Sequence, residues 1–236
     1  MKAVILAGGK GRRLAPYTAV LPKPLMPIGD VPILEVVIRQ LRHAGFEDIT
    51  LAVGYLAELL VAYFGDGSKL GVRIHYSREE QPLGTAGPLG LLDRWNEPFL
   101  VMNGDLLTTL NYRLMWDHHH LNSAIATLAT YQRDVTIDLG VIETDEGGWV
   151  QNYIEKPTYH YTVSSGVYVF APKALEYIPR GEHMDLPDLI LKLLAAGHQI
   201  ATYPFDGYWL DIGRQDDYEL AISEFEHHRD RFLAPE

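Results

Sequence analysis

The sequence of 236 residues contains no cysteine, which excludes disulfides, thiolate nucleophiles and zinc sites built on cysteine. It also lacks any apolar run close to the ~20 residues that a membrane-spanning helix needs. The first residues read as a strand rather than as a signal peptide, so we expect a cytoplasmic protein with no membrane partner. A net charge of −11 argues against nucleic acid as a partner, because nucleic-acid binding favours a basic surface.

Acidic residues are absent before Asp30, although the same segment contains five Lys or Arg residues. Gly8, Gly9 and Gly11 follow a short apolar stretch, and their missing Cβ atoms allow backbone N–H groups to turn around an anion. Lys23 lies between two prolines that stiffen the backbone around its amine. The glycines alone would fit an ordinary turn after a first strand, and they match neither G-x-G-x-x-G nor a P-loop. Together with Lys23 they predict a phosphate-binding site.

Apolar stretches and helical spacings alternate over the first 105 residues. The expected strands are 2–6, 49–53, 72–76 and 99–102, and the expected helices are 33–41, capped by Asp30, 56–64 and 89–95. Strand and helix in this order imply right-handed crossovers between parallel strands. The predicted fold class is therefore α/β, with a Rossmann-like, mostly parallel sheet flanked by helices.

The second part of the chain is richer in strands. We expect strands near 124–131, 138–143, 149–154 and 163–170, and helices at 112–121 after Asn111, at 185–196 and at 214–228. No repeat, low-complexity linker or clear boundary separates the two parts. The sequence thus predicts a single domain over 1–236, with one half at about 1–110 and a β-rich half at about 111–236.

Several short motifs recur in one order along the chain. They are LAGGKGRRL at 6–14, LPKPLMPIG at 21–29, PLGTAGP at 82–88, NGD at 103–105, EKP at 155–157, SSGVYVF at 164–170 and WLDIG at 209–213. In this combination the chain resembles the sugar nucleotidyltransferase (nucleotide-sugar pyrophosphorylase) family, and most of all its mannose-1-phosphate guanylyltransferase-like members. The resemblance implies the nucleotide-diphospho-sugar transferase fold, with the nucleotide bound by the first half and a sugar phosphate by the second.

The resemblance also implies a role for individual residues. The implied catalytic residues are Arg13, Lys23 and Asp105. The implied nucleotide-binding residues are Leu6, Ala7, Gly8, Gly9, Gly11, Arg13, Lys23, Glu79, Gly84 and Thr85. The implied sugar-phosphate-binding residues are Gly140, Glu155, Lys156, Ser164 and Gly166.

Asp105 follows a strand in an α/β pattern, where ligands bind beyond the carboxyl end of the sheet. Asp211 is a lone acid between apolar neighbours, and together the two carboxylates suit Mg²⁺, the expected cofactor. Taken singly, each aspartate could instead cap a turn. Glu155 and Lys156 could likewise be an exposed ion pair that contributes little to stability. Two departures from the family pattern affect specificity: Ser164 stands where Asn is common and Arg12 where Thr is common.

The nucleotide base is expected to lie at residues 78–85. In thymidylyl and uridylyl relatives a glutamine stands five residues before the glycine that matches Gly84, and here that position is Glu79. An ionised carboxylate only accepts hydrogen bonds, and guanine presents two adjacent donors, so Glu79 favours GTP. Gln81 lies close enough to take the role in a differently bent loop.

The predicted activity is Mg²⁺-dependent transfer of GMP from GTP to a sugar 1-phosphate, with release of pyrophosphate. Two alternatives stay open: a uridylyl- or thymidylyltransferase acting on a hexose 1-phosphate, and a catalytically silent regulatory subunit. The expected partners are GTP or another nucleoside triphosphate and a sugar 1-phosphate, and a homo-oligomer is possible. His118, His119 and His120 cannot converge on one ion from one helix, so they are expected to be a surface run.

Overall fold

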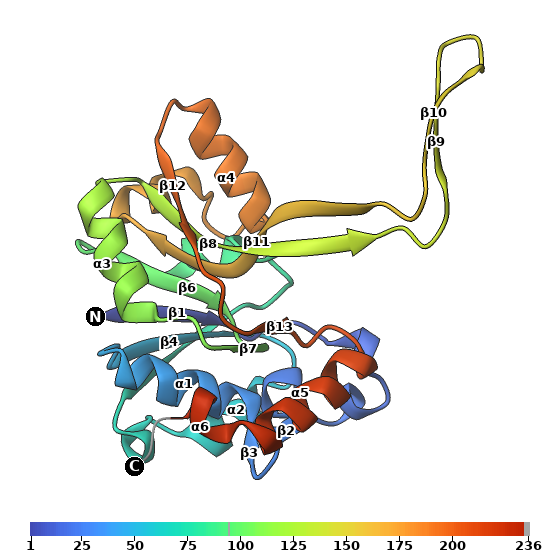
Figure 1. Cartoon of the computed structure of the whole chain (residues 1–236). Helices are drawn as coiled ribbons and strands as arrows, with labels where there is room; N and C mark the ends of the chain where they lie inside the picture. The colour runs from blue at the N-terminus through green and yellow to red at the C-terminus, as the bar shows by residue number, and fades with distance from the viewer. Residues whose placement is uncertain (94, 234–236) are drawn as a thin grey trace.

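A computed structural model describes residues 1–93 and 95–233, and its centre is a seven-stranded sheet (Figure 1). Its strands are β1 (Lys2–Leu6), β4 (Asp48–Val53), β5 (Arg73–Arg78), β6 (Phe99–Asn103), β8 (Ala126–Thr136), β11 (Thr158–Phe170) and β12 (Ile200–Pro204). They lie in the order β12-β8-β11-β6-β1-β4-β5. Neighbouring strands are parallel except where β11 pairs with β6 and with β8. The mostly parallel α/β sheet is confirmed.

Helices cover both faces of this sheet. They are α1 (Ile33–His43), α2 (Ala57–Phe64), α3 (Tyr112–Asn122), α4 (Leu186–Ala195), α5 (Gln215–His227) and α6 (Arg229–Phe232). On one face Ile5 of β1 lies in a core cluster with Leu34 of α1 and Leu60 of α2. Val4 points to the other face and lies in a cluster with Leu189 of α4, because successive strand residues alternate between faces. Among the described helices, none is long and apolar enough to cross a membrane.

Short elements complete the structure beside the main sheet. The antiparallel pairs are β2 (Pro27–Ile28) with β3 (Val31–Pro32), and β7 (Leu106–Thr108) with β13 (Trp209–Asp211). The 3-10 helices are η1 (Arg12–Leu14), η2 (Tyr17–Ala19), η3 (Lys23–Leu25), η4 (Ser68–Leu70), η5 (Gly87–Leu91) and η6 (Pro172–Tyr177). A third core cluster joins Met26 of the N-terminal loop, Ile212 after β13 and Phe225 of α5. It brings three distant segments together behind the carboxyl end of β6.

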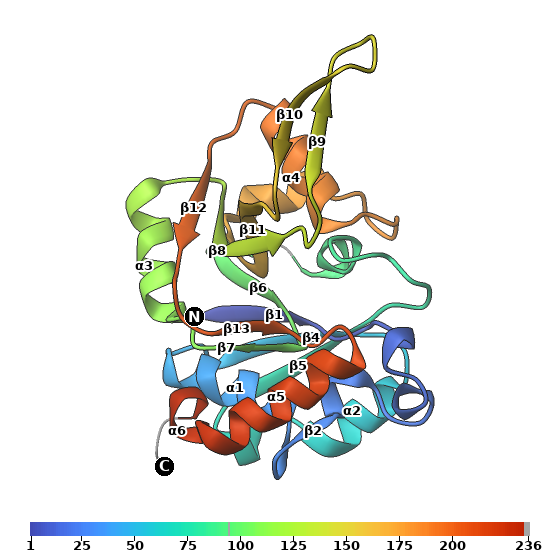
Figure 2. The ribbon, with the colours of Figure 1, turned by 45° about the vertical axis from the view of Figure 1, so that its right-hand side comes forward.

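An arm projects from the body, as Figures 1 and 2 show. It consists of the outer parts of β8 and β11 and of the antiparallel pair β9 (Val141–Thr144) and β10 (Val150–Ile154). Apolar side chains are exposed along it, among them Leu139 at 73% and Trp149 at 75%. The residues of this arm therefore contribute little to the core of the body.

The sequence predicted most of the larger elements but not all of them. The helix expected at 89–95 is wrong, because Gly87–Leu91 forms the 3-10 helix η5, with Arg94 outside the described residues. Asp30 does not cap α1, since Val31 and Pro32 form β3 and Pro32 precedes the helix. Asn111 caps α3 as expected, its Oδ1 accepting a hydrogen bond from the Leu114 N–H at 3.0 Å. The strands β2, β3, β7, β12 and β13 were not anticipated.

The expectation of a surface histidine run is wrong for its central member. His119 is buried, and its Nδ1 lies 2.8 Å from the Thr127 hydroxyl oxygen. His118 is half-buried and His120 is exposed, so the three rings do point in different directions. Burial, with smaller contributions from His120 and His118, lowers the pKa of His119 to about 4.

The buried His119 should make stability depend on pH. Its folded pKa of about 4 lies below the ordinary 6.5, so the unfolded chain binds more protons between these values. The free energy of unfolding should fall by up to about 3 kcal/mol on this account as the pH drops from about 6.5 to about 4. Urea titrations across this range should show a shallower loss in His119→Gln. The exposed His120→Gln serves as the matched control, and an unchanged profile in His119→Gln would contradict the assignment.

Candidate functional site

A cleft of about 990 Å³ opens at the carboxyl ends of β1, β4, β5 and β6. The sequence-predicted residues that line it are Leu6, Gly8, Gly9, Arg13, Glu79, Gly84, Thr85, Asp105 and Asp211. Ligands of open α/β sheets bind at this end of the strands. The structure thus gathers most of the implied nucleotide-binding residues and both implied metal-binding residues around one cavity.

The glycine-rich loop enters this cleft directly from β1. Ala7 is buried and its N–H donates to the Ala52 carbonyl of β4 at 2.8 Å, which anchors the start of the loop. Gly11 has φ +59°, and a Cβ there would lie 2.9 Å from Cγ2 of Thr18. The Thr18 hydroxyl also donates to the Gly11 carbonyl at 2.9 Å, so glycine is required for this turn. A Cβ on Gly9 would meet nothing within 4 Å, which leaves open space above that residue.

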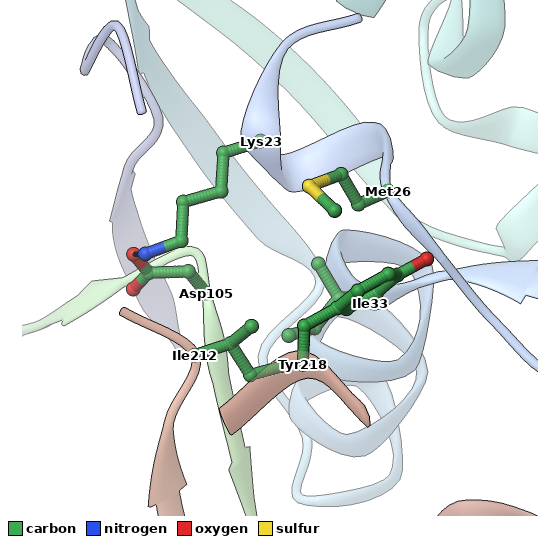
Figure 3. Close-up of a pocket in the computed structure, with 6 residues that line it drawn as sticks. All are labelled: Lys23, Met26, Ile33, Asp105, Ile212 and Tyr218. Atoms are coloured by element: carbon green, nitrogen blue, oxygen red, sulfur yellow. Dashed lines mark hydrogen bonds and ion pairs between the residues drawn. The ribbon is translucent and has the colours of Figure 1, made fainter. Parts of the chain in front are cut away.

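Lys23 is held in contact with both predicted metal-binding residues. Its Nζ donates to Oδ2 of Asp105 in a short ion pair and lies 3.9 Å from Oδ1 of Asp211. Lys23 begins η3 between Pro22 and Pro24, and its ammonium points at the Asp105 carboxylate in Figure 3. The side chains beside this pair are the apolar Met26, Ile33 and Ile212, with Tyr218.

The pairing of β7 with β13 places the two carboxylates beside each other. Asp211 lies opposite Leu106 in the register, and the Ile212 N–H donates to the Asp105 carbonyl at 3.2 Å. Burial and then the neighbouring Asp105 raise the pKa of Asp211, while Lys23 and Arg13 act in the opposite direction. Asp211 is therefore harder to ionise than a free aspartate, and the nearby cations Lys23 and Arg13 offset part of that effect.

These carboxylates suit a cation that also binds the substrate. Oδ1 of Asp105 is buried and has no hydrogen-bond partner among the described residues. Within the same described residues, no three His, Asp or Glu side chains come together as a metal site made by the protein alone. Mg²⁺ typically takes one or two carboxylates and completes its coordination with phosphate oxygens and water. Asp105 and Asp211 fit that requirement.

Glu79 reaches across the floor of the cleft from the end of β5. A Cβ on Gly8 would lie 2.5 Å from its Oε1, and one on Gly54 would lie 2.7 Å from the same atom. Its Oε2 accepts a hydrogen bond from the Leu83 N–H at 3.1 Å. The absence of side chains at Gly8 and Gly54 therefore makes room for this carboxylate.

The loop at 82–88 is fastened to the start of α4. Asp185 Oδ1 accepts a hydrogen bond from the Thr85 N–H at 2.9 Å, and the Leu186 N–H donates to the Thr85 hydroxyl at 2.7 Å. A Cβ on Gly84, whose φ is +79°, would lie 2.6 Å from the Met184 carbonyl. Both predicted residues of this loop thus shape the cleft wall and have structural partners of their own.

The residues predicted to bind the sugar phosphate are divided between two places. Gly166 adjoins the cleft, because a Cβ there would lie 2.8 Å from Nδ2 of Asn103, which lines the cavity. Ser164 lies two residues away, with its hydroxyl 2.9 Å from that of Tyr168. Gly166 has φ +78°, which favours glycine at this position.

Gly140, Glu155 and Lys156 lie on the arm and do not line the cleft. Gly140 packs so closely on Tyr153 that a Cβ would overlap the phenol oxygen. The Tyr153 hydroxyl donates to Oε2 of Glu155 at 3.1 Å. Lys156 pairs with Asp138 at 2.9 Å, and both side chains are more than half exposed. The arm therefore brings these three residues near one another but not to Asp105.

Some cleft residues were not among the sequence-predicted ones. They are Lys10, Arg12, Ala52, Gly54, Tyr55, Pro88 and Asn103. Arg78, Glu80, Gln81 and Pro82 also line the cleft, and they belong to the segment 78–85 that was expected to bind the base. Gly54 could have been predicted from the sequence. It directly follows the apolar residues of β4, much as Gly8 comes shortly after the apolar residues of β1. Its role against Glu79 needed the sheet order, which places β4 between β1 and β5.

The chain belongs to the nucleotidyl transferase family, whose sequence profile matches residues 2–228. It is 37% identical over 242 aligned residues to a UTP–glucose-1-phosphate uridylyltransferase of Synechocystis, covering 94% of this chain and 62% of that protein. It is 35% identical over 222 residues to a mannose-1-phosphate guanylyltransferase of Mycobacterium tuberculosis, covering 92% and 62%. The chain spans about three fifths of the length of these curated relatives.

Solved structures share the fold at lower sequence identity. HddC from Yersinia pseudotuberculosis superposes with a TM-score of 0.74 at 24% identity, over 95% of this chain and 99% of that one. This likeness concerns the fold alone. The nucleotide-diphospho-sugar transferase architecture expected from the motifs agrees with it.

Lys23 should contribute to stability as well as to any ligand binding. Lys23→Met removes the cation from two partly buried carboxylates, so the metal-free protein should lose about 2 kcal/mol of unfolding free energy. Lys10→Met, which removes an exposed charge of the same loop, should change stability by less than ~0.5 kcal/mol.

Chemical denaturation in the presence of a chelator measures this effect. Asp105→Asn should recover part of the loss in the Lys23→Met background, because it removes one of the uncompensated charges. Additive effects of the two substitutions would show that the ion pair contributes nothing to the fold.

Proposed function

We propose that the chain is a sugar-1-phosphate guanylyltransferase, which transfers GMP from GTP to a sugar 1-phosphate. A phosphate oxygen of the sugar 1-phosphate attacks the α-phosphorus of GTP. The new P–O bond forms as the bond to the β-phosphate breaks, and pyrophosphate leaves. The attacking group is already an anion, so the reaction needs no side-chain nucleophile. The observation that supports this best is the Lys23–Asp105–Asp211 group at the edge of the glycine-lined cleft.

The N-terminal loop supplies the binding surface for the triphosphate. Gly9 is exposed and leaves the backbone accessible, and Arg13 lines the same cavity. In the proposed reaction Arg13 and Lys23 hold the phosphate oxygens in position and stabilise the charge that develops on the leaving pyrophosphate. Positioning and charge neutralisation are the main sources of rate in phosphoryl transfer.

Asp105 and Asp211 are the residues that would hold Mg²⁺. When bound, the ion neutralises phosphate charge and orients the phosphate groups. The raised pKa of Asp211 and the unpartnered Oδ1 of Asp105 both support a cation at this place.

Glu79 is the residue we assign to base recognition. Its carboxylate sits at the junction of Gly8, Gly54 and the 82–88 loop, and it already accepts one backbone hydrogen bond. Guanine offers two adjacent donors, N1–H and the N2 amine, to a carboxylate, whereas uracil and thymine present carbonyl oxygens beside a single N–H. The uridylyl alternative keeps support from the 37% identical Synechocystis relative.

A matrix of nucleoside triphosphates against sugar 1-phosphates, read by pyrophosphate release, tests the proposed function. Turnover with GTP and one of the sugar phosphates at the highest kcat/KM supports it. Preference for UTP or dTTP would reject the guanylyl assignment and leave nucleotidyl transfer intact. No turnover with any pair would favour the silent-subunit alternative.

The two carboxylates should be essential for metal-dependent turnover. Asp105→Asn and Asp211→Asn should each lower kcat by two or more orders of magnitude, because removal of a charge-stabilising group from such a site costs about 3 kcal/mol. The pyrophosphate-release assay with a Mg²⁺ titration measures this, and circular dichroism confirms that the variants fold. Asp206→Asn, a substitution outside the cleft lining, is the control. Turnover without any divalent cation in the parent protein would contradict the metal role.

Glu79 should determine the preference among bases. Glu79→Gln should narrow the kcat/KM ratio of GTP to UTP by about tenfold or more, mainly through weaker use of GTP, since a charge-assisted hydrogen bond is worth about 1.5–3 kcal/mol. Inosine triphosphate lacks the N2 amine and should be a poorer substrate than GTP for the parent enzyme. The neighbouring Glu80→Gln is the matched control. Equal use of inosine triphosphate and GTP, with unchanged selectivity in Glu79→Gln, would place base recognition elsewhere in the loop.

A further inference from the structure

The projecting arm consists of two antiparallel ribbons of two strands each, which stand away from the body in Figures 1 and 2. The inner ribbon is formed by residues 132–136 of β8 and 158–162 of β11, and the outer ribbon by β9 and β10. Residues directly opposite each other in an antiparallel pair place their side chains on the same face, and successive residues alternate between the two faces. The register therefore shows which side chains share each face of the ribbons.

One face of the inner ribbon is polar. Its cross-strand pairs are Gln132 with Thr162, Asp134 with His160, and Thr136 with Thr158. In these pairs the hydrogen-bonding side-chain atoms lie 2.9, 2.6 and 3.0 Å apart, respectively. All of these side chains are exposed and are bonded across the strands, as expected of a sheet face that meets water.

The opposite face of the inner ribbon is mostly apolar. It carries Val135 opposite Tyr159, and Arg133 opposite Tyr161. The ring centroids of Tyr159 and Tyr161 lie 6.5 Å apart. An apolar sheet face normally packs against a core, yet Val135 and Tyr161 are exposed. The described part of the chain therefore leaves this face largely uncovered.

The outer ribbon also has two unlike faces. The pairs on its first face are Ile142 with Tyr153 and Thr144 with Val150, and those on its second face are Val141 with Ile154 and Glu143 with Asn152. On the first face Ile142, Val150 and Tyr153 are each more than half exposed. On the second face the apolar pair is half-buried, and the Asn152 amide donates to Oε2 of Glu143 at 3.0 Å. The uncovered apolar side chains of the outer ribbon thus gather on its first face.

We call the apolar face of the inner ribbon and the first face of the outer ribbon together the apolar arm surface. Its apolar side chains, with Leu139 between the ribbons and Trp149 before β10, expose on the order of 600 Å². Contact between two such surfaces would bury on the order of 1,200 Å², which reaches the size of a stable protein–protein interface. A ribbon of two strands is marginally stable by itself in water, so the outer ribbon needs a packing partner.

We propose that the apolar arm surface is an interface with a second copy of this chain, in which the arms of the two copies pack face to face across a two-fold axis. The same face from each copy closes such a contact. Arg133 is the one charged side chain among the paired residues of these faces, so identical faces meet with little like-charge repulsion. A nearly uncharged face has no charge pattern that would select a different protein, whereas a second copy supplies matching apolar side chains. The polar face of each inner ribbon stays in water.

Sedimentation equilibrium of the full chain across micromolar concentrations tests this interface. The parent chain should form a dimer that dissociates on dilution. Val135→Lys combined with Ile142→Lys should weaken dimerisation by about a hundredfold or more, because each substitution occurs in both copies and places a charge in a desolvated contact. Thr136→Lys combined with Asn152→Lys adds the same charge to the opposite faces and should change the dissociation constant by less than about threefold.

The control pair separates an apolar contact from a general charge effect. A parent chain that stays monomeric at all these concentrations would overturn the proposal. So would a dimer that survives Val135→Lys with Ile142→Lys, or one that both pairs of substitutions weaken equally. Circular dichroism of each variant verifies that the fold is retained.

The lack of cysteine in the chain allows a second, independent test. Maleimide should label Ile142→Cys more slowly at concentrations where the dimer forms than at concentrations where it dissociates. It should label Asn152→Cys, on the other face of the same ribbon, at one rate throughout. A labelling rate of Ile142→Cys that does not depend on protein concentration would contradict the interface, whether or not the lysine variants fold.

Discussion

Two aspartates placed against each other need a positive charge between them, and this constraint shapes the centre of the molecule. Asp105 follows β6 and Asp211 ends β13, and the β7–β13 pairing fixes them side by side. Lys23 pairs with Asp105 and lies 3.9 Å from Asp211, which requires the N-terminal loop to reach the carboxyl end of β6. The third core cluster, with Met26, Ile212 and Phe225, holds the loop there. Packing of apolar side chains thus brings together charged groups that would otherwise separate.

Much of this arrangement could be predicted from the sequence because its signals are local. The apolar run of β1, the helical spacing of α1 and the capping residue Asn111 each specify their own element. The carboxyl ends of parallel strands share one edge of a sheet, so residues that follow β1, β5 and β6 are expected to meet there. Family resemblance, rather than spacing, supplied the link from Asp105 to Asp211.

What could not be predicted depended on contacts between distant segments. β7 and β13 have three residues each and exist through their mutual pairing, which leaves no periodic signal. Residues 89–95 have apolar spacing typical of a helix, yet Gly90 packs against Ile178 and the chain forms only η5. His119 was expected on the surface because three consecutive helical histidines cannot converge on one ion, yet its ring is buried beside Thr127 of β8. Glu155 and Lys156 lie on the arm and outside the cleft lining. The sequence did not reveal this, because the next strand along the chain, β11, belongs to the main sheet.

The late position of Asp211 in the chain has a consequence for the order in which the molecule assembles during synthesis. The chain is synthesised from its N-terminus, and the residues of β1, β4, β5 and β6 are all complete by residue 103. Lys23 and Asp105 can then form a neutral pair before β13 has been made. Asp211 arrives only with β13, and α5 and α6 follow it and complete the third core cluster. Asp211 therefore joins Lys23 and Asp105 only when the parts of α5 and α6 that pack in the third core cluster are still to come or just made.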